Sequence, residues 1–141
     1  MAKTHGFSLI ELLVVICIIS IMTGFAAVSL EPLWKKHELR LAVTDLKGQI
    51  QILRTKAILQ QKTYQIKFSG PDLFFRRNNG NQWENWTRRE LNAQVQFSMS
   101  GTCQFYSKGF ASPKTIELAH NNYKQNLIVN INGRVRTSEI Y

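Results

Sequence analysis

The sequence has few of the residues from which catalytic and metal sites are built. Its two cysteines, Cys17 and Cys103, form no CxxC motif and no Cys/His cluster occurs, so a zinc site has no support. Cys17 lies in a hydrophobic run and Cys103 in the polar half, so we expect no disulfide between them. A P-loop, a GxGxxG motif and a nucleophile-elbow serine are also absent. We therefore expect neither an enzyme nor a cofactor.

Charge is absent from the apolar run between Leu12 and Leu30. As a helix, these 19 residues would span about 28 Å, close to the thickness of a bilayer core. Lys3, before the run, favours a cytoplasmic leader and an external C-terminus. No small-residue cleavage site of the secretory kind follows the run. The run therefore predicts a single-pass membrane helix.

The residues just before this run form a distinctive junction, Gly6-Phe7-Ser8-Leu9-Ile10-Glu11. The junction resembles that of type IV prepilins and of the pseudopilins of type II secretion. The resemblance implies that a prepilin peptidase cuts after Gly6 and methylates the new N-terminus, Phe7. It also implies that Glu11 pairs with the cationic N-terminus of a neighbouring subunit during assembly. The alternative is a solvated interfacial Glu11, although a carboxylate near the end of a membrane helix usually marks function.

The junction and the hydrophobic pattern together divide the chain into four segments. The resemblance implies a protein of the inner membrane whose C-terminal part lies in the periplasm. After assembly with other pilin subunits, that part would belong to a pilus that can reach the cell surface. The segments are a leader at 1–6, a transmembrane helix at 7–30, its amphipathic continuation at 31–62, and an antiparallel β part at 63–141.

Beyond the membrane run, apolar residues keep a helical spacing. Pro32 predicts a kink near the outer interface. After it, the spacing alternates four and three residues, which gives one apolar stripe. The stripe is short for a coiled coil, so we expect it to pack on a sheet of the same domain. Its members are Leu39, Val43, Leu46, Ile50, Leu53 and Ala57.

From Thr63 onward, apolar residues recur at every second position, as is typical of strands. Turn signals separate these segments, and Asn132-Gly133 favours a two-residue hairpin. Short strands at this spacing indicate antiparallel pairing. The fold class is therefore α+β and pilin-like, with a long N-terminal helix packed on antiparallel sheets. The predicted strands are Thr63–Phe68, Leu73–Arg77, Gln82–Thr87, Ala93–Met99, Thr102–Tyr106, Thr115–Leu118, Gln125–Ile131 and Arg134–Ile140.

A second resemblance covers the end of the helix and the first strand. Leu53–Ile58 followed by Tyr64–Phe68 is similar to the corresponding segment of the GspH/FimT group of minor pilins. The charge of this part is also distinctive, because from Glu31 onward 17 basic and 8 acidic residues carry the whole net charge of +9. Both a solvated basic surface and a polyanionic partner are compatible with that charge.

Two arginines near the C-terminus are candidates to contact such a partner. On a strand, Arg134 and Arg136 would project side by side about 7 Å apart, which matches successive phosphates. A solvated strand face is the alternative. However, Gly133-Arg134-Val135-Arg136 resembles the C-terminal Gly-Arg-x-Arg of FimT minor pilins, which implies sequence-independent DNA binding during natural transformation. Further candidates to extend the patch are Lys108, Lys114 and Lys124.

A second basic cluster, Arg76-Arg77 with Arg88-Arg89, lies among aromatic residues. Arginines interleaved with aromatics are compatible with a surface that stacks single-stranded nucleic acid. A hairpin with aromatics in the core and arginines in solvent explains the same alternation, and we favour it. The aromatics are Phe74, Phe75, Trp83 and Trp86.

Two functions are compatible with these features. The one we favour from the sequence is a minor type IV pilin that binds DNA non-specifically through its C-terminal hairpin and takes part in DNA uptake. The alternative is a structural minor pilin or a GspH-like pseudopilin that primes or caps filament assembly without binding DNA. The basic charge and the pair Arg134 and Arg136 favour the first.

Overall fold

The computed structural model describes residues 8–91, 94–98 and 100–141, without the side chains of residues 26–29. It divides into two compact units, Met1–Trp34 and Lys35–Tyr141, which are described separately. One helix contributes to both units, and the strands belong to the second. The elements are α1 (Leu9–Gln60), β1 (Thr63–Ser69), β2 (Asp72–Asn78), β3 (Thr87–Glu90), β4 (Gln96–Phe97), β5 (Gly101–Phe105), β6 (Lys114–His120), β7 (Tyr123–Val129) and β8 (Val135–Thr137).

The first unit contains the apolar beginning of α1. The carbonyl of Ser8 accepts hydrogen bonds from the N–H groups of Glu11 (3.0 Å) and Leu12 (3.2 Å). Ser8 and Glu11 have the spacing of a capping box, and a carboxylate in the first turn is stabilised by the helix dipole. The side chains from Leu9 to Phe25 are exposed. Such a continuous apolar surface suits an environment of lipid or of other apolar helices.

The length of the apolar helix bears on the predicted membrane span. Within the described residues, no single helix is long and apolar enough to cross a membrane. A bent pair, Leu9–Phe25 with Leu30–Gln60, has the length and composition to do so. Pro32 lies inside α1 and does not end it, and the kink expected there stays a prediction.

In the second unit, the predicted stripe of α1 forms one side of the core. All six stripe residues are buried, and Leu39, Leu46 and Ile50 have no exposed surface. The strands supply the facing side chains, among them Phe68 of β1 and Leu127 of β7. The prediction that this segment is an amphipathic helix packed on sheet is therefore confirmed.

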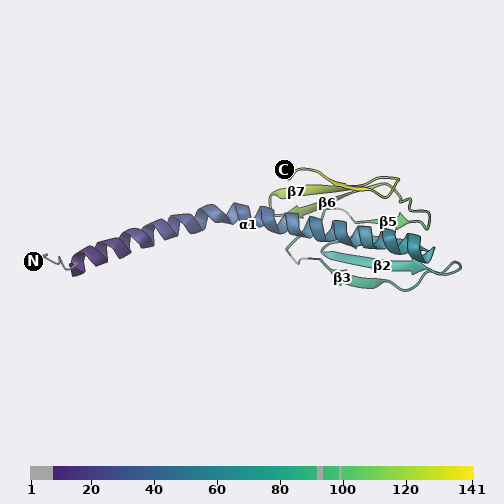
Figure 1. Cartoon of the computed structure of the whole chain (residues 1–141), viewed down its shortest axis with the longest axis horizontal. Coiled ribbons are helices and arrows are strands. Elements are labelled where there is room, and N and C mark those ends of the chain that lie inside the picture. Colours follow the sequence, from purple (N-terminus) through teal and green to yellow (C-terminus); the bar gives the residue numbers. More distant parts are fainter. Residues whose placement is uncertain (1–7, 92–93, 99) are drawn as a thin grey trace, which may run out of the picture. The chain divides into compact units, whose positions relative to one another are not determined.

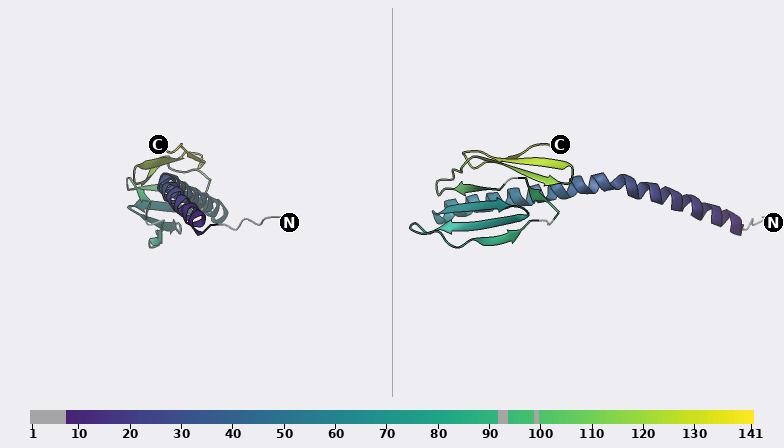
Figure 2. Two further views of the ribbon diagram at one scale, coloured as in Figure 1. Left: turned by 90° about the vertical axis from the view of Figure 1, so that its left-hand side faces the viewer. Right: turned by 180° about the vertical axis from the view of Figure 1, so that it is seen from behind.

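Two antiparallel sheets complete the second unit. One has the strand order β3-β2-β1-β5 and the other β4-β6-β7-β8. The end of α1 runs alongside β2 and β3 of one sheet and β6 and β7 of the other (Figure 1), as the view from behind also shows (Figure 2). The predicted α+β class with antiparallel sheets is confirmed.

A buried histidine joins the helix to the second sheet. His120, at the end of β6, is only 6% exposed. Its Nε2 lies 3.2 Å from Oε2 of Glu38 on α1, and its Nδ1 lies 2.6 Å from the carbonyl oxygen of Gln94. Because both ring nitrogens have a partner, the burial of this polar ring does not leave a hydrogen-bonding group unsatisfied.

The predicted strand Gln82–Thr87 is wrong. Within it, Trp83 forms a single isolated bridge with Asn78, and β3 begins only at Thr87. The physical reason is that Trp83 and Trp86 both face Arg76. The guanidinium carbon of Arg76 lies 4.4 Å and 4.2 Å from the centroids of these two rings. A regular strand would turn two residues three positions apart to opposite faces.

Of the two C-terminal strands, β7 (Tyr123–Val129) begins and ends two residues earlier than predicted, and β8 is shorter than predicted. The β7–β8 connection is a longer loop than the two-residue turn expected at Asn132-Gly133, because Val129 pairs with Val135. Asn130 organises this loop: its carbonyl accepts from the N–H of Gly133 (2.9 Å) and its Oδ1 accepts from the N–H of Arg134 (2.9 Å). Arg134 therefore precedes β8, which spans only part of the predicted Arg134–Ile140.

The predicted strand Ala93–Met99 is also shorter in the structure. Only Gln96–Phe97 forms a strand, β4, while Ala93 and Met99 lie outside the described residues. β4 pairs with the end of β6, where Phe97 is opposite Leu118.

Glu117 on β6 forms a surface network with the C-terminal residue. Its carboxylate accepts hydrogen bonds from Lys124 Nζ (3.1 Å) and from the hydroxyl of Tyr141 (2.9 Å). Hydrogen bonding with Ser98, and then with Lys124 and Tyr141, lowers the pKa of Glu117 from its usual 4.5 to about 2. The folded state therefore keeps this carboxylate ionised at a lower pH than the unfolded state does.

This pKa shift predicts a defined pH window for acid destabilisation. The contribution of Glu117 is fully present above about pH 4.5 and is lost as the pH falls toward about 2. We expect Glu117→Gln to lower the thermal midpoint at neutral pH, and the difference from wild type to shrink through that window. Tryptophan fluorescence measures the midpoints, with Glu139→Gln as a control. A difference that stays constant with pH would contradict the prediction.

Candidate functional site

The prepilin-like junction is only partly within the described residues. The predicted processing residues, Gly6 and Phe7, lie outside them. Glu11 is exposed in the first turn of α1. Its carboxylate therefore lies on the surface of an apolar helix, where a cation of a neighbouring chain has access to it.

Gly133, in the β7–β8 connection, is fixed by close packing. Its φ is +68°, a conformation that favours glycine. A Cβ atom at this position would lie 2.6 Å from Arg54 Nε and 2.8 Å from the carbonyl oxygen of Gly109. Gly133 is also buried. Its role in the structure is therefore to let the loop approach α1, rather than to present a surface to a partner.

Arg54 of α1 joins two loops at this end of the second unit. Its Nε donates a hydrogen bond to the carbonyl of Gly109 (3.2 Å), and its side chain lies against Gly133. The N–H of Ala111 also donates to the carbonyl of Ile131 (2.9 Å), which links the same two segments. Sequence reasoning missed Arg54, because a charged residue next to a buried Leu53 carries no local signal of a distant partner.

Arg134 and Arg136 remain candidates for a binding role. Both are exposed, and Val135 between them packs against the core, as predicted. Neither guanidinium group has a hydrogen bond or ion pair with any residue that the structure describes. Two uncompensated positive charges therefore lie on one short segment of the surface.

The three candidate lysines are divided between the two ends of the second sheet. Lys114 is at the same end of the sheet as the arginines, but it lies opposite Val129, which pairs with Val135, so its side chain is on the core-facing side of the sheet and not on that of Arg136. The prediction that Lys114 extends the patch is therefore wrong. Lys108 is exposed beside Gly109, in the loop that contacts Gly133. We define the C-terminal basic surface as the set Lys108, Arg134 and Arg136.

Lys124 does not join this surface, so its prediction as part of one patch is wrong. It lies toward the other end of β7, about 17 Å from Val129 at the usual rise of a strand. Its Nζ is 3.1 Å from Oε1 of Glu117, so its charge is compensated. Proximity in the sequence was misleading here because the two ends of a strand are far apart in space.

Two arginines of the second cluster are neutralised by acidic neighbours. Arg77 forms an ion pair with Glu84, and Arg88 pairs with Asp72 (3.0 Å) and Glu90 (3.1 Å). The hydrogen bond with Glu84 raises the pKa of Arg77, and the hydrogen bond with Asp72 raises that of Arg88. These two arginines are therefore poor candidates for capturing an external polyanion.

Arg76 covers faces of the two indole rings on which nucleic-acid bases would have to stack. It lies between Trp83 and Trp86, and its Nε donates to Oε1 of Gln65 (2.6 Å). Of the four aromatics predicted to be core, only Phe75 packs against the core, and Trp86 is 36% exposed. A surface for stacking bases would need the ring faces that the guanidinium covers.

The N-terminal region matches a known family model. Residues 1–27 match the prokaryotic N-terminal methylation motif. This motif indicates a prepilin-type segment that anchors the chain in a membrane. No curated protein sequence matches the chain.

Solved structures of similar fold include two kinds of minor filament subunit. The minor pseudopilin EpsH from the type 2 secretion system of Vibrio cholerae has a TM-score of 0.58 and 16% identity, over 72% of this chain and 96% of that one. The type IV minor pilin FimU of Pseudomonas aeruginosa has a TM-score of 0.59 and 17% identity, over 73% of this chain and 90% of that one. The chain has a pilin-like fold. This pilin-like fold agrees with the class predicted from the sequence.

The packing around Gly133 predicts that its replacement destabilises the pilin-like domain. Gly133→Ala adds both backbone strain at positive φ and a clash with Arg54 and Gly109, so we expect a loss of roughly 2 kcal/mol or more. Gly80→Ala is the matched control, because Gly80 also has a positive φ (103°) but nothing lies within 4 Å of an added Cβ. Denaturant unfolding compares the two. Equal losses of unfolding free energy in the two variants would contradict the close approach of Gly133 to Arg54 and Gly109.

Proposed function

We propose that this protein is a minor subunit of a type IV pilin-like filament, either a pilus or a type II secretion pseudopilus. The observation that carries the proposal is the combination of an N-terminal methylation motif at residues 1–27 with a fold like those of EpsH and FimU. The proposal favours a structural role, in which the subunit primes or caps the filament. A fold shared by pilins and pseudopilins does not choose between the two machines.

The proposal gives each part of the N-terminal region a task. Prepilin peptidase would cut after Gly6 and methylate Phe7, and the exposed apolar side chains from Leu9 to Phe25 would cross the inner membrane once. The second unit would then lie in the periplasm until assembly. In the filament, Glu11 would pair with the N-terminal amine of a neighbouring subunit, because both charges otherwise lie in an apolar environment.

Removal of the Glu11 carboxylate tests this assembly role. We expect Glu11→Ala to insert into the membrane normally and to appear in sheared filaments at least about tenfold less than wild type, since a lost ion pair of about 1.4 kcal/mol changes a population tenfold. Immunoblots of membrane and filament fractions measure both quantities. Ser20→Ala, on the same exposed helix, is the matched control. Normal incorporation of Glu11→Ala would refute the role.

A second candidate function is non-specific DNA binding during natural transformation. The observation that favours it is the uncompensated pair Arg134 and Arg136, together with the exposed Lys108, on the C-terminal basic surface. Guanidinium groups bind phosphates through paired N–H donors, and such contacts read the backbone rather than the bases. Gly133 would serve this site by positioning the loop. DNA binding would be additional to assembly, because assembly into a filament would place the second unit outside the membrane, where it could meet DNA.

The salt dependence of DNA binding tests this candidate. If three to five phosphates are engaged, log K should fall with log salt at a slope of about −2.7 to −4.5. We expect Arg134→Gln/Arg136→Gln to reduce the magnitude of that slope by about two, since each lost contact removes about 0.9. Fluorescence anisotropy with a labelled duplex measures the slope.

Lys124→Gln provides the control for this measurement. It removes a charge that Glu117 already compensates at a distance from the arginines, so binding should change little. Unchanged binding by the double arginine variant would exclude the C-terminal basic surface as the site. If the wild type does not bind DNA, this candidate is rejected and the structural role is the one that stays.

A further inference from the structure

A groove of about 540 Å³ lies in the second unit between α1 and the strands β2 and β3. Its lining includes no residue of the C-terminal basic surface, so the two regions are distinct. Apolar side chains form part of the lining, among them Leu53, Phe75 and Ile52. Ile52 is 50% exposed, which leaves an apolar contact surface open at the helix side.

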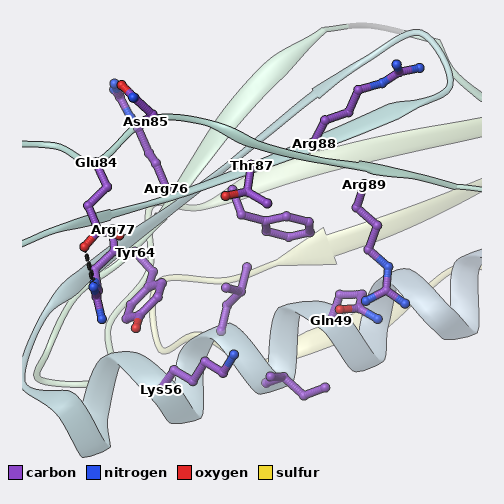
Figure 3. Close-up of a pocket in the computed structure, with 13 residues that line it drawn as sticks. Gln49, Lys56, Tyr64, Arg76, Arg77, Glu84, Asn85, Thr87, Arg88 and Arg89 are labelled. Atoms are coloured by element: carbon purple, nitrogen blue, oxygen red, sulfur yellow. Dashed lines mark hydrogen bonds and ion pairs between the residues drawn. The ribbon is translucent and has the colours of Figure 1, made fainter.

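Two positive charges face this groove without a compensating acid. Lys56 extends from α1 and Arg89 from β3, and both are exposed. Figure 3 shows the guanidinium group of Arg89 reaching toward α1 beside Gln49, and Lys56 rising from the helix. Within the described residues, neither side chain has a hydrogen bond or an ion pair. By contrast, Arg77 in the same lining is paired with Glu84.

The groove is bordered by an edge strand. β3 pairs with β2 on one side and, among the described strands, with none on the other. Thr87 and Arg89 are two residues apart, so both lie on the face of β3 that lines the groove. A peptide added to the open edge would place alternate side chains on that same face. Backbone pairing and side-chain contact are therefore available together.

We infer that this groove binds an extended acidic peptide segment of a partner protein. β3 supplies the backbone hydrogen bonds, and Lys56 and Arg89 bind a carboxylate of the segment. Ile52 and Phe75 contact an apolar side chain on the same face of the peptide. The inference goes beyond filament assembly and DNA binding, because it assigns a peptide ligand to a surface that neither function uses.

Charge and shape favour a peptide over nucleic acid. Arg77 and Arg88 of the lining are already paired with acids, which leaves Lys56 and Arg89 to bind a single carboxylate rather than a run of phosphates. The indole rings of Trp83 and Trp86 already stack on Arg76, so they offer no free platform for bases. The apolar lining also gives a phosphate backbone no partner.

The test uses the full chain in detergent micelles and fluorescein-labelled peptides. The probe is a short peptide that repeats glutamate-serine-leucine-serine, which places glutamate and leucine on the same face of a strand and is called the glutamate–leucine peptide. In the comparison peptides, lysine replaces the glutamates (lysine–leucine peptide) or serine replaces the leucines (glutamate–serine peptide). We expect the glutamate–leucine peptide to bind most tightly, and Lys56→Gln/Arg89→Gln to weaken it at least about tenfold. Arg40→Gln/Lys67→Gln removes the same charge from exposed positions outside the groove and should leave binding unchanged.

A second variant and a competitor complete the test. Ile52→Ser should weaken binding of the glutamate–leucine peptide and leave that of the glutamate–serine peptide unchanged, which separates apolar contact from charge. Equal binding by wild type and Lys56→Gln/Arg89→Gln would overturn the proposal. So would equal binding of the lysine–leucine peptide, absence of binding by the glutamate–leucine peptide, or its displacement from the groove by single-stranded oligothymidine. These results leave filament incorporation and duplex binding untouched, so failure here is distinguishable from failure of the proposed functions.

Discussion

The burial of one stripe of α1 against two sheets is the constraint on which the second unit depends. Leu39, Leu46 and Ile50 are removed from water, and each sheet contributes side chains to the same core. Fully burying a side chain of this size stabilises the fold by about 1.5–3 kcal/mol. Neither sheet has a second layer of helix in the described residues. Both sheets are therefore positioned by the same helix.

One short stretch of α1 contacts three different parts of the second unit. Leu53 lies in the core, Arg54 holds the loops that contain Gly109 and Gly133, and Ile52 and Lys56 line the groove. The separation follows from helical geometry, because residues 52 and 56 lie four apart on one face while adjacent residues point in different directions. The C-terminal basic surface and the groove are thus both positioned by residues within about one turn of each other.

Periodic features of the fold were predictable from the sequence, and features set by single distant partners were not. The α1 stripe and the antiparallel strands follow from repeated burial of one face, which leaves a local pattern. The start of β3 depends instead on Arg76 between two tryptophans, and the β7–β8 loop depends on the side chain of Asn130. For the candidate site, Lys124 was misassigned because its ion-pair partner, Glu117, lies on another strand.

Compensation of charge, rather than its amount, distinguishes the surfaces of this molecule. Arg77 and Arg88 are ion-paired and hydrogen-bonded, so an external anion would have to replace contacts that already exist. Arg134 and Arg136 are free of such contacts within the described residues, and an anion there displaces only water. A pilin-like fold is compatible with a subunit that is only structural and with one that also binds DNA. The chemistry that decides between them therefore lies in these uncompensated side chains, because the anchor and the core are needed in both cases.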